Sequence, residues 1–222
     1  MPSITMKYFL IRLLNIITGL FLYAVGIVVT IRANIGYAPW EVFHVGIAGK
    51  IGLSIGTVSI IVGLMIVIIV VVLGEKLGFG TILNMILIGL FMNIIFMINL
   101  IPKAENLVNG IIMLITGILI ISFGSYFYIK AAFGAGPRDS LMVVLARRTK
   151  LPIGLCRGVI ELLATIIGWF LGGMVGIGTV ISVVVIGFCI QTVFKILKFD
   201  ATAVKHETLR ETFSTFYQFR KQ

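Results

Sequence analysis

Two stretches of sequence 98 residues apart decide the fold: GYAPWE at residues 36–41 and GAGPRD at residues 134–139. Around them the chain aligns with itself without a gap, residues 12–97 on residues 110–195, and 24 of the aligned pairs are identical. The pairs include several glycines, a threonine and a proline: Thr18 with Thr116, Gly19 with Gly117, Gly26 with Gly124, Pro39 with Pro137 and Gly89 with Gly187. Because chance matches of isoleucine and leucine do not align glycine and proline in this way, the sequence indicates a duplicated unit.

Long apolar runs make up most of both units. The chain is 59% hydrophobic and 12% charged, against roughly 45–50% and about 25% in soluble domains. Crossing a bilayer takes about 20 apolar residues, and six runs reach that length: 8–31, 54–73, 80–101, 107–130, 153–172 and 177–197. Since no alternating ten-residue pattern predicts barrel strands, we predict an all-α membrane protein with six transmembrane helices. The first run exceeds a signal-peptide core and is kept as a mature helix.

The basic residues predict the orientation of these spans. With six spans, fifteen of the eighteen Lys and Arg residues fall on the side that carries both termini, and only Arg32, Lys50 and Lys103 fall on the other. By the positive-inside rule, both termini are cytoplasmic. The net charge of +10 therefore reflects membrane topology, and nucleic acid is not an expected partner.

Each copy of the unit holds three spans, repeat one at about 8–101 and repeat two at about 107–198. An odd number of spans makes the second copy enter the membrane from the opposite face, which gives two inverted three-helix repeats. Transporters and channels often place a site at mid-depth between such repeats, although duplication can also simply produce a stable bundle. We expect one integral membrane domain over residues 1–198, followed by a short cytoplasmic amphipathic tail over residues 199–222.

The two proline stretches predict re-entrant half-helices. Each lies in a segment too long for a tight turn and too apolar for a solvated loop, and proline suits the first turn of a helix. A short helix is therefore expected to begin at Pro39 and another at Pro137. Their free N–H groups would lie at depth, where the positive end of each helix dipole can receive an anionic or strongly polar group.

Charged and aromatic residues follow each proline. Glu41 and Asp139 occupy the first turns, where they either contribute to a ligand site or only cap the helix. Trp40 and Arg138 hold equivalent positions, so the two copies differ where a site needs asymmetry. Arg138 is either a fork for a carboxylate or phosphate or an orientation anchor.

Glu161 is the charged residue that lies deepest within a span. An ionisable group there costs at least about 2.5 kcal/mol and usually faces a partner or a cavity. Arg157 is its i,i+4 partner, and Arg138 is a candidate partner through space. A structural ion pair and a proton or substrate site both fit this pattern.

The glycines beside the prolines complete the candidate site. We expect the backbone at Gly36–Ala38 and Gly134–Gly136, with Gly36, Gly134 and Gly136 as its defining residues, to form the walls. His44 on the first half-helix is expected to be a satisfied interfacial histidine.

No catalytic, metal or cofactor motif is present in the sequence. Cys156 and Cys189 lie in apolar stretches without the spacing of a disulfide or zinc site, and no hydrolase, Walker or dinucleotide motif occurs. We therefore expect no enzyme, no cofactor and no metal. The predicted function is transport or permeation of a small polar or anionic solute. The alternative is a membrane accessory or scaffold protein that recruits a cytoplasmic or membrane partner, and a homo-oligomer fits either function.

The motifs also resemble a known family. GAGPRD at 134–139, the series Gly154, Arg157 and Glu161, and GYAPWE at 36–41 together resemble the YczE branch of the YczE/YyaS/YitT bacterial membrane proteins. The tail is too short for the soluble C-terminal domain of the YitT branch. The resemblance implies a multi-pass protein of the bacterial plasma (inner) membrane and implies no particular biochemical activity.

Overall fold

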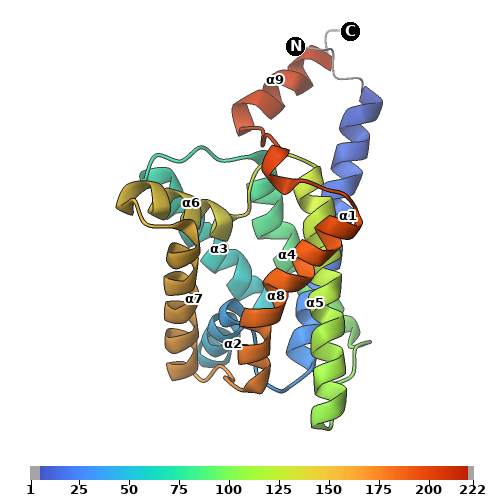
Figure 1. The fold of residues 1–222 in the computed structure, drawn as a ribbon, viewed down its shortest axis with the longest axis vertical. Helices are drawn as coiled ribbons and strands as arrows, with labels where there is room; N and C mark the ends of the chain where they lie inside the picture. Colours follow the sequence, from blue (N-terminus) through green and yellow to red (C-terminus); the bar gives the residue numbers. More distant parts are fainter. Residues whose placement is uncertain (1–5, 220–222) are drawn as a thin grey trace.

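The computed structural model describes residues 6–219, and every regular secondary-structure element in this range is a helix (Figure 1). The elements in chain order are α1 (Met6–Arg32), α2 (Pro39–Ile51), α3 (Ile55–Val72), α4 (Phe79–Ile98), α5 (Leu107–Lys130), α6 (Pro137–Thr149), α7 (Ile153–Phe170), α8 (Ile177–Ile196), the 3-10 helix η1 (Ala201–Ala203) and α9 (Leu209–Phe219). Arg220 and Lys221, which contribute to the predicted charge asymmetry, lie outside the described residues.

Six of these helices, α1, α3, α4, α5, α7 and α8, are long and apolar enough to cross a membrane. This confirms the predicted number of spans. Four of them end one to three residues earlier than predicted, at Val72, Ile98, Phe170 and Ile196. Left-handed residues follow these ends, including Asn99 with a φ of 53° and Gly172 with a φ of 99°, and such residues commonly terminate helices.

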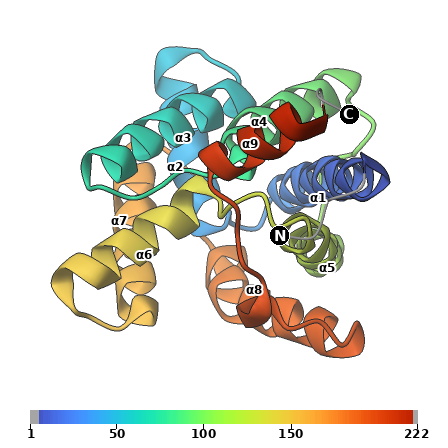
Figure 2. The same cartoon turned by 90° about the horizontal axis from the view of Figure 1, so that it is seen from above.

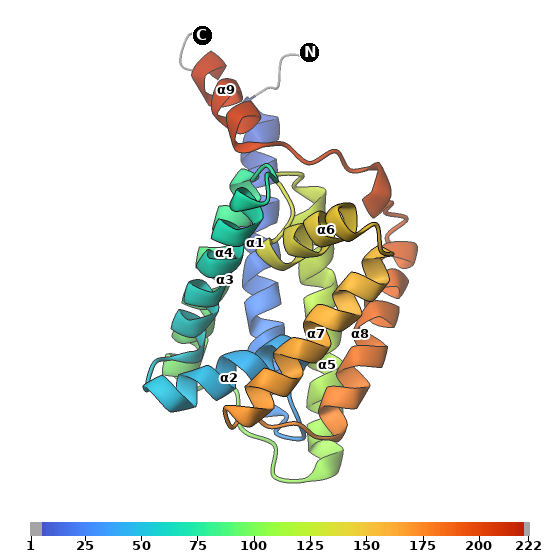
Figure 3. The ribbon, with the colours of Figure 1, turned by 90° about the vertical axis from the view of Figure 1, so that its left-hand side faces the viewer.

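The duplication of the sequence corresponds to a duplicated order of helices. Helices α2, α3 and α4 begin and end 98 residues before α6, α7 and α8. Both short helices begin at the predicted prolines and run for thirteen residues. They lie near opposite ends of the bundle, with α6 toward the end that carries α9 and α2 toward the other end (Figure 3).

The centre of the bundle is an antiparallel pair formed by α1 and α5 (Figures 1 and 2). The backbone of Gly19 touches that of Gly124, and the backbone of Gly26 touches that of Gly117, so no side chain fits at these crossings. Small residues that let backbones approach closely are the usual means of packing helices in membranes. In the repeat, Gly19 is equivalent to Gly117 and Gly26 to Gly124. The two copies therefore meet along equivalent helices.

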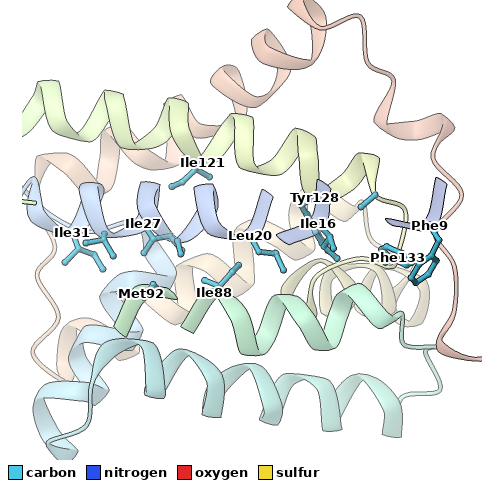
Figure 4. Close-up of a cluster of buried hydrophobic side chains, with 13 residues drawn as sticks. Phe9, Ile16, Leu20, Ile27, Ile31, Ile88, Met92, Ile121, Tyr128 and Phe133 are labelled. Carbon is cyan, nitrogen blue, oxygen red and sulfur yellow. The ribbon is translucent and has the colours of Figure 1, made fainter. Parts of the chain in front are cut away.

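Apolar side chains from three helices form the largest core (Figure 4). Ile16, Leu20 and Ile27 of α1 are at most 2% exposed. They pack against Met92 of α4 and Ile121 of α5. The α1–α5 pair is thus held against α4 by ordinary close packing.

The two copies differ in how their last two helices pack. Helix α3 lies along α4, and the backbones of Gly56 and Gly89 touch there. The equivalent residues, Gly154 on α7 and Gly187 on α8, have open space where a side chain would begin. Helix α7 packs on α2, and α8 packs on α5 instead. Helices α7 and α8 are therefore splayed where α3 and α4 are closed.

Candidate functional site

Two adjoining cavities lie between the starts of α2 and α6. Their volumes are about 280 Å³ and about 90 Å³. The larger cavity is lined by Gly136–Asp139 at the start of α6, and the smaller by Ala38–Glu41 at the start of α2. They share six lining residues: Tyr23, Ile27, Arg138, Asp139, Arg157 and Ile186. The starts of both short helices thus line the same cavity region.

Equivalent residues of the two copies line the two cavities. The larger cavity has Ser59, Gly63 and Asn84, and the smaller has their repeat partners Arg157, Glu161 and Ser182. A serine and a glycine in the first copy are therefore replaced by a charged pair in the second. The charge that the second copy adds at these positions lies on α7.

Arg138 lies between the two copies. Its guanidinium carbon is 4.6 Å from the ring centroid of Trp40, and its Nη1 is 3.7 Å from Oε1 of Glu41, whose side chain is 8% exposed. Three of the predicted site residues, from the short helices α2 and α6, are thus brought together. The stacking and the ion pair hold the arginine inside the cavity region.

Arg157 and Glu161 form the predicted i,i+4 ion pair, with Nε of the arginine 2.8 Å from Oε1 of the glutamate. The Arg157 side chain is 45% exposed, and that of Glu161 is 20% exposed. The candidate contact between Arg138 and Glu161 is not formed, because Arg138 extends instead toward α2 and pairs with Glu41.

The two first-turn acids behave differently. Both acids line the smaller cavity, and Asp139 lines the larger one as well. Glu41 also faces Arg138, with Oε1 of the glutamate 3.7 Å from Nη1 of the arginine. The choice between a ligand-site role and a capping role for these acids stays a prediction.

Of the three site glycines, only Gly136 lines a cavity. Gly36 and Gly134 lie outside both linings. Their φ angles are 112° and 123°, and their backbones touch those of Gly176 and Gly78, just before α8 and α4. These two glycines position the site by holding each proline turn against the other copy, because only glycine fits this conformation and this spacing.

His44 differs from its prediction. It is 1% exposed, lines the larger cavity, and its Nε2 has no hydrogen-bond partner among residues 6–219. The prediction of a histidine at the membrane interface with satisfied hydrogen bonds is wrong. Helices α7 and α3 pack on α2, so the His44 side chain is buried inside the bundle.

Sequence reasoning also missed the two lining tyrosines, Tyr23 and Tyr128. The hydroxyl of Tyr128 donates a hydrogen bond to the carbonyl of Gly134 at 3.0 Å. A tyrosine in the middle of an apolar run carries a polar group that needs a partner, and this was the available signal. Within residues 6–219, no group of three or more His, Cys, Asp or Glu residues is arranged to hold a metal ion.

Arg12 ties the turn before α6 to the C-terminal segment. Its Nε donates to the carbonyl of Ala131 at 2.8 Å, and its Nη1 lies 2.5 Å from Oε1 of Glu207. The backbone N–H of Glu207 donates to Ala132, and that of Leu209 donates to Leu77. The tail helix predicted by the sequence is therefore preceded by a segment docked on the bundle.

We expect Arg12→Gln to release this segment, because Glu207 loses its charged partner. Amide exchange at Glu207 and Leu209 should become at least tenfold faster, measured by hydrogen–deuterium exchange with mass spectrometry. Lys7→Gln, on the exposed face of the same helix, is the matched control and should leave the exchange unchanged. Equal exchange in the two variants would show that the backbone hydrogen bonds alone hold the segment.

Comparison with known proteins places this chain in a family. Residues 10–195 match the family described as "Family of unknown function (DUF6198)". The chain is 33% identical over 175 residues to "Uncharacterized membrane protein YczE" of Bacillus subtilis (strain 168), covering 78% of this chain and 80% of that protein. It is 35% identical over 179 residues to an "Uncharacterized protein" of Haemophilus influenzae, covering 81% of each.

A third relative, "Uncharacterized protein YyaS" of Bacillus subtilis (strain 168), is 24% identical over 189 residues, covering 81% of this chain and 90% of that protein. No solved structure matches the chain. The family resemblance predicted from the proline motifs is thereby confirmed. The chain is a polytopic membrane protein that belongs to the DUF6198 family and is related to the YczE and YyaS proteins.

Proposed function

We propose that this protein is a transporter or permeation protein, rather than an enzyme, and that it moves a small polar or anionic solute across the bacterial inner membrane. The observation that carries the proposal is the cavity region between the starts of α2 and α6, with Arg138 inside it. Helix starts and arginines both favour a negative group. A buried polar region between two membrane helix breaks is a typical transporter site.

The same proposal includes two inverted repeats with re-entrant half-helices. Its support is the antiparallel pairing of α1 with its repeat partner α5 and the position of α2 and α6 near opposite ends (Figure 3). Contacts are also exchanged between the copies: Gly80 N–H donates to Phe133, and Gly178 N–H donates to Ile35. The start of α1 and helix α9 lie at one end (Figure 1), which fits cytoplasmic termini.

A screen of small anions against the purified protein tests the proposal. At least one carboxylate or phosphate is expected to raise the melting temperature and to enter proteoliposomes that contain the protein. Arg138→Lys should bind it at least tenfold more weakly, because lysine lacks the planar fork. Arg147→Lys, on the exposed end of the same helix, is the matched control and should bind as the wild type does.

The two rival functions give different results in this screen. Binding with uptake supports transport. If no small anion binds and no uptake occurs, the accessory or scaffold function becomes the better explanation. Equal affinity in the two lysine variants would show that Arg138 is only an anchor.

A further inference from the structure

The larger cavity is lined by polar side chains that have no partner in the described part of the protein. Tyr23 of α1, Ser59 of α3 and Asn84 of α4 line it, and their side chains form no hydrogen bond with any residue that the structure describes. His44 lines the same cavity, and its Nε2 is also unpaired within residues 6–219. A polar group away from water costs free energy unless it is hydrogen-bonded. These four groups are therefore available to whatever enters the cavity.

Three polar atoms converge beside Gly136, in the wall of this cavity. A Cβ atom built on that glycine would lie 3.3 Å from Oδ2 of Asp139, 3.4 Å from the hydroxyl oxygen of Tyr128 and 3.5 Å from Nδ2 of Asn84. The Tyr128 hydroxyl donates its proton to the carbonyl of Gly134, so its oxygen is left as an acceptor. This corner thus offers two acceptor oxygens beside an amide, which both donates and accepts.

Hydrogen bonding, rather than net charge, distinguishes ligands of the larger cavity. The two arginines in its lining are already paired, Arg138 with Glu41 and Arg157 with Glu161. Asp139 forms no ion pair among the described residues. It lies in the first turn of α6, where its negative charge faces the positive end of the helix dipole.

From these observations we infer that the larger cavity takes the hydroxyl groups of a small polyhydroxylated solute. A hydroxyl both donates and accepts, so a run of hydroxyls matches the mixed donors and acceptors contributed by five helices. Water occupies about 30 Å³ per molecule, so about 280 Å³ has room for roughly nine waters or a solute with three or four carbons. This inference rests on the proposed function and names the class of its solute.

Uptake of radiolabelled erythritol into proteoliposomes tests the inference. We expect saturable uptake that protein-free liposomes do not show. Glycerate should compete at least tenfold better than propionate, because the two anions have the same carbon chain and charge and differ only in two hydroxyls. A site built to hydrogen-bond a hydroxyl discriminates strongly against an analogue that lacks it.

Two asparagines of α4 provide a matched pair of variants. Asn84 has no hydrogen-bond partner among the described residues, whereas Asn93 accepts from the N–H of Gly56 and donates to the hydroxyl of Thr57, both at 3.1 Å. Asn84→Leu should lower erythritol uptake at least tenfold and leave the melting temperature unchanged. Asn93→Leu should lower the melting temperature and leave the uptake per folded protein unchanged. A merely structural role of Asn84 would give the opposite result for that variant.

Two glycines provide a second matched pair. The φ of −64° and ψ of 161° at Gly136 suit alanine, so Gly136→Ala adds a methyl group where the three polar atoms converge without straining the backbone. It should lower erythritol uptake at least tenfold. Gly158 of α7 has no atom within 4 Å of a built Cβ, and Gly158→Ala is the control that should take up erythritol as the wild type does.

Other solutes separate this inference from the proposed function. If small anions bind and are taken up but erythritol is not, the proposed function stands and this inference falls. Equal competition by glycerate and propionate, or equal erythritol uptake by the wild type and Asn84→Leu, would also overturn the inference. Competition by methylammonium as strong as that by glycerol would replace the polyol with a cation. If neither erythritol nor any anion is taken up, both proposals fall.

Discussion

Gly89→Leu is expected to destabilise this protein severely, while Gly187→Leu leaves its stability unchanged or slightly raised. The two glycines are repeat partners in the middle of α4 and α8. Gly89 touches the backbone of Gly56 and the side chain of Ile60, whereas Gly187 has open space beside it. A leucine at position 89 must push α3 and α4 apart, and overpacking of this kind costs about 1–3 kcal/mol or more. At position 187 it exchanges glycine for a better helix former, worth roughly 1 kcal/mol.

Thermal unfolding of the two purified variants in the same detergent measures this difference. The substitution, the helix position and the change in volume are identical, so the pair isolates the packing of the neighbouring helix. Equal loss of melting temperature in both variants would mean that α7 and α8 pack as α3 and α4 do, and the splayed arrangement would have to be abandoned.

Arg138→Gln is expected to produce the second large effect, a loss of about 3 kcal/mol in the free energy of unfolding. Removing one partner of a buried ion pair leaves the other charge without compensation, and the Glu41 side chain is 8% exposed. The double variant Arg138→Gln/Glu41→Gln removes both charges and should recover most of the loss. Denaturation of the two single variants and the double variant gives the coupling energy.

A more exposed pair, made by another arginine of α6, provides the comparison. Nη1 of Arg147 lies 2.8 Å from Oε2 of Glu75 in the turn after α3, and the two side chains are 64% and 19% exposed. Exposed pairs contribute roughly 0–1 kcal/mol, so Arg147→Gln should change stability little. If Arg138→Gln and Arg147→Gln have the same small effect, then Arg138 is solvated and not part of a buried site.

The helices and their starting residues could be predicted from the sequence because local signals determine them. Apolar length gave the six spans, and the prolines at 39 and 137 gave the starts of the two short helices. The Arg157–Glu161 pair was also accessible, since helical spacing alone places those side chains together.

Interactions between the copies could not be predicted from spacing. Arg138 meets Glu41 and Trp40 only because α2 and α6 begin on facing sides of one cavity. The separation of α7 and α8 could not be predicted for a related reason. Gly154 and Gly187 are the repeat partners of Gly56 and Gly89, which form the close crossing of α3 and α4. Local sequence specifies that a close crossing is possible, and the surrounding helices decide whether it forms.

The exchanged hydrogen bonds have a consequence for biosynthesis. Ile35, which the ribosome adds early, has its carbonyl satisfied by the N–H of Gly178, a residue added more than a hundred positions later. In the proposed re-entrant arrangement this carbonyl lies at membrane depth, and hydrocarbon does not tolerate an unpaired carbonyl. The insertion machinery or water must therefore satisfy it in the nascent first copy until the second copy has been translated as far as Gly178.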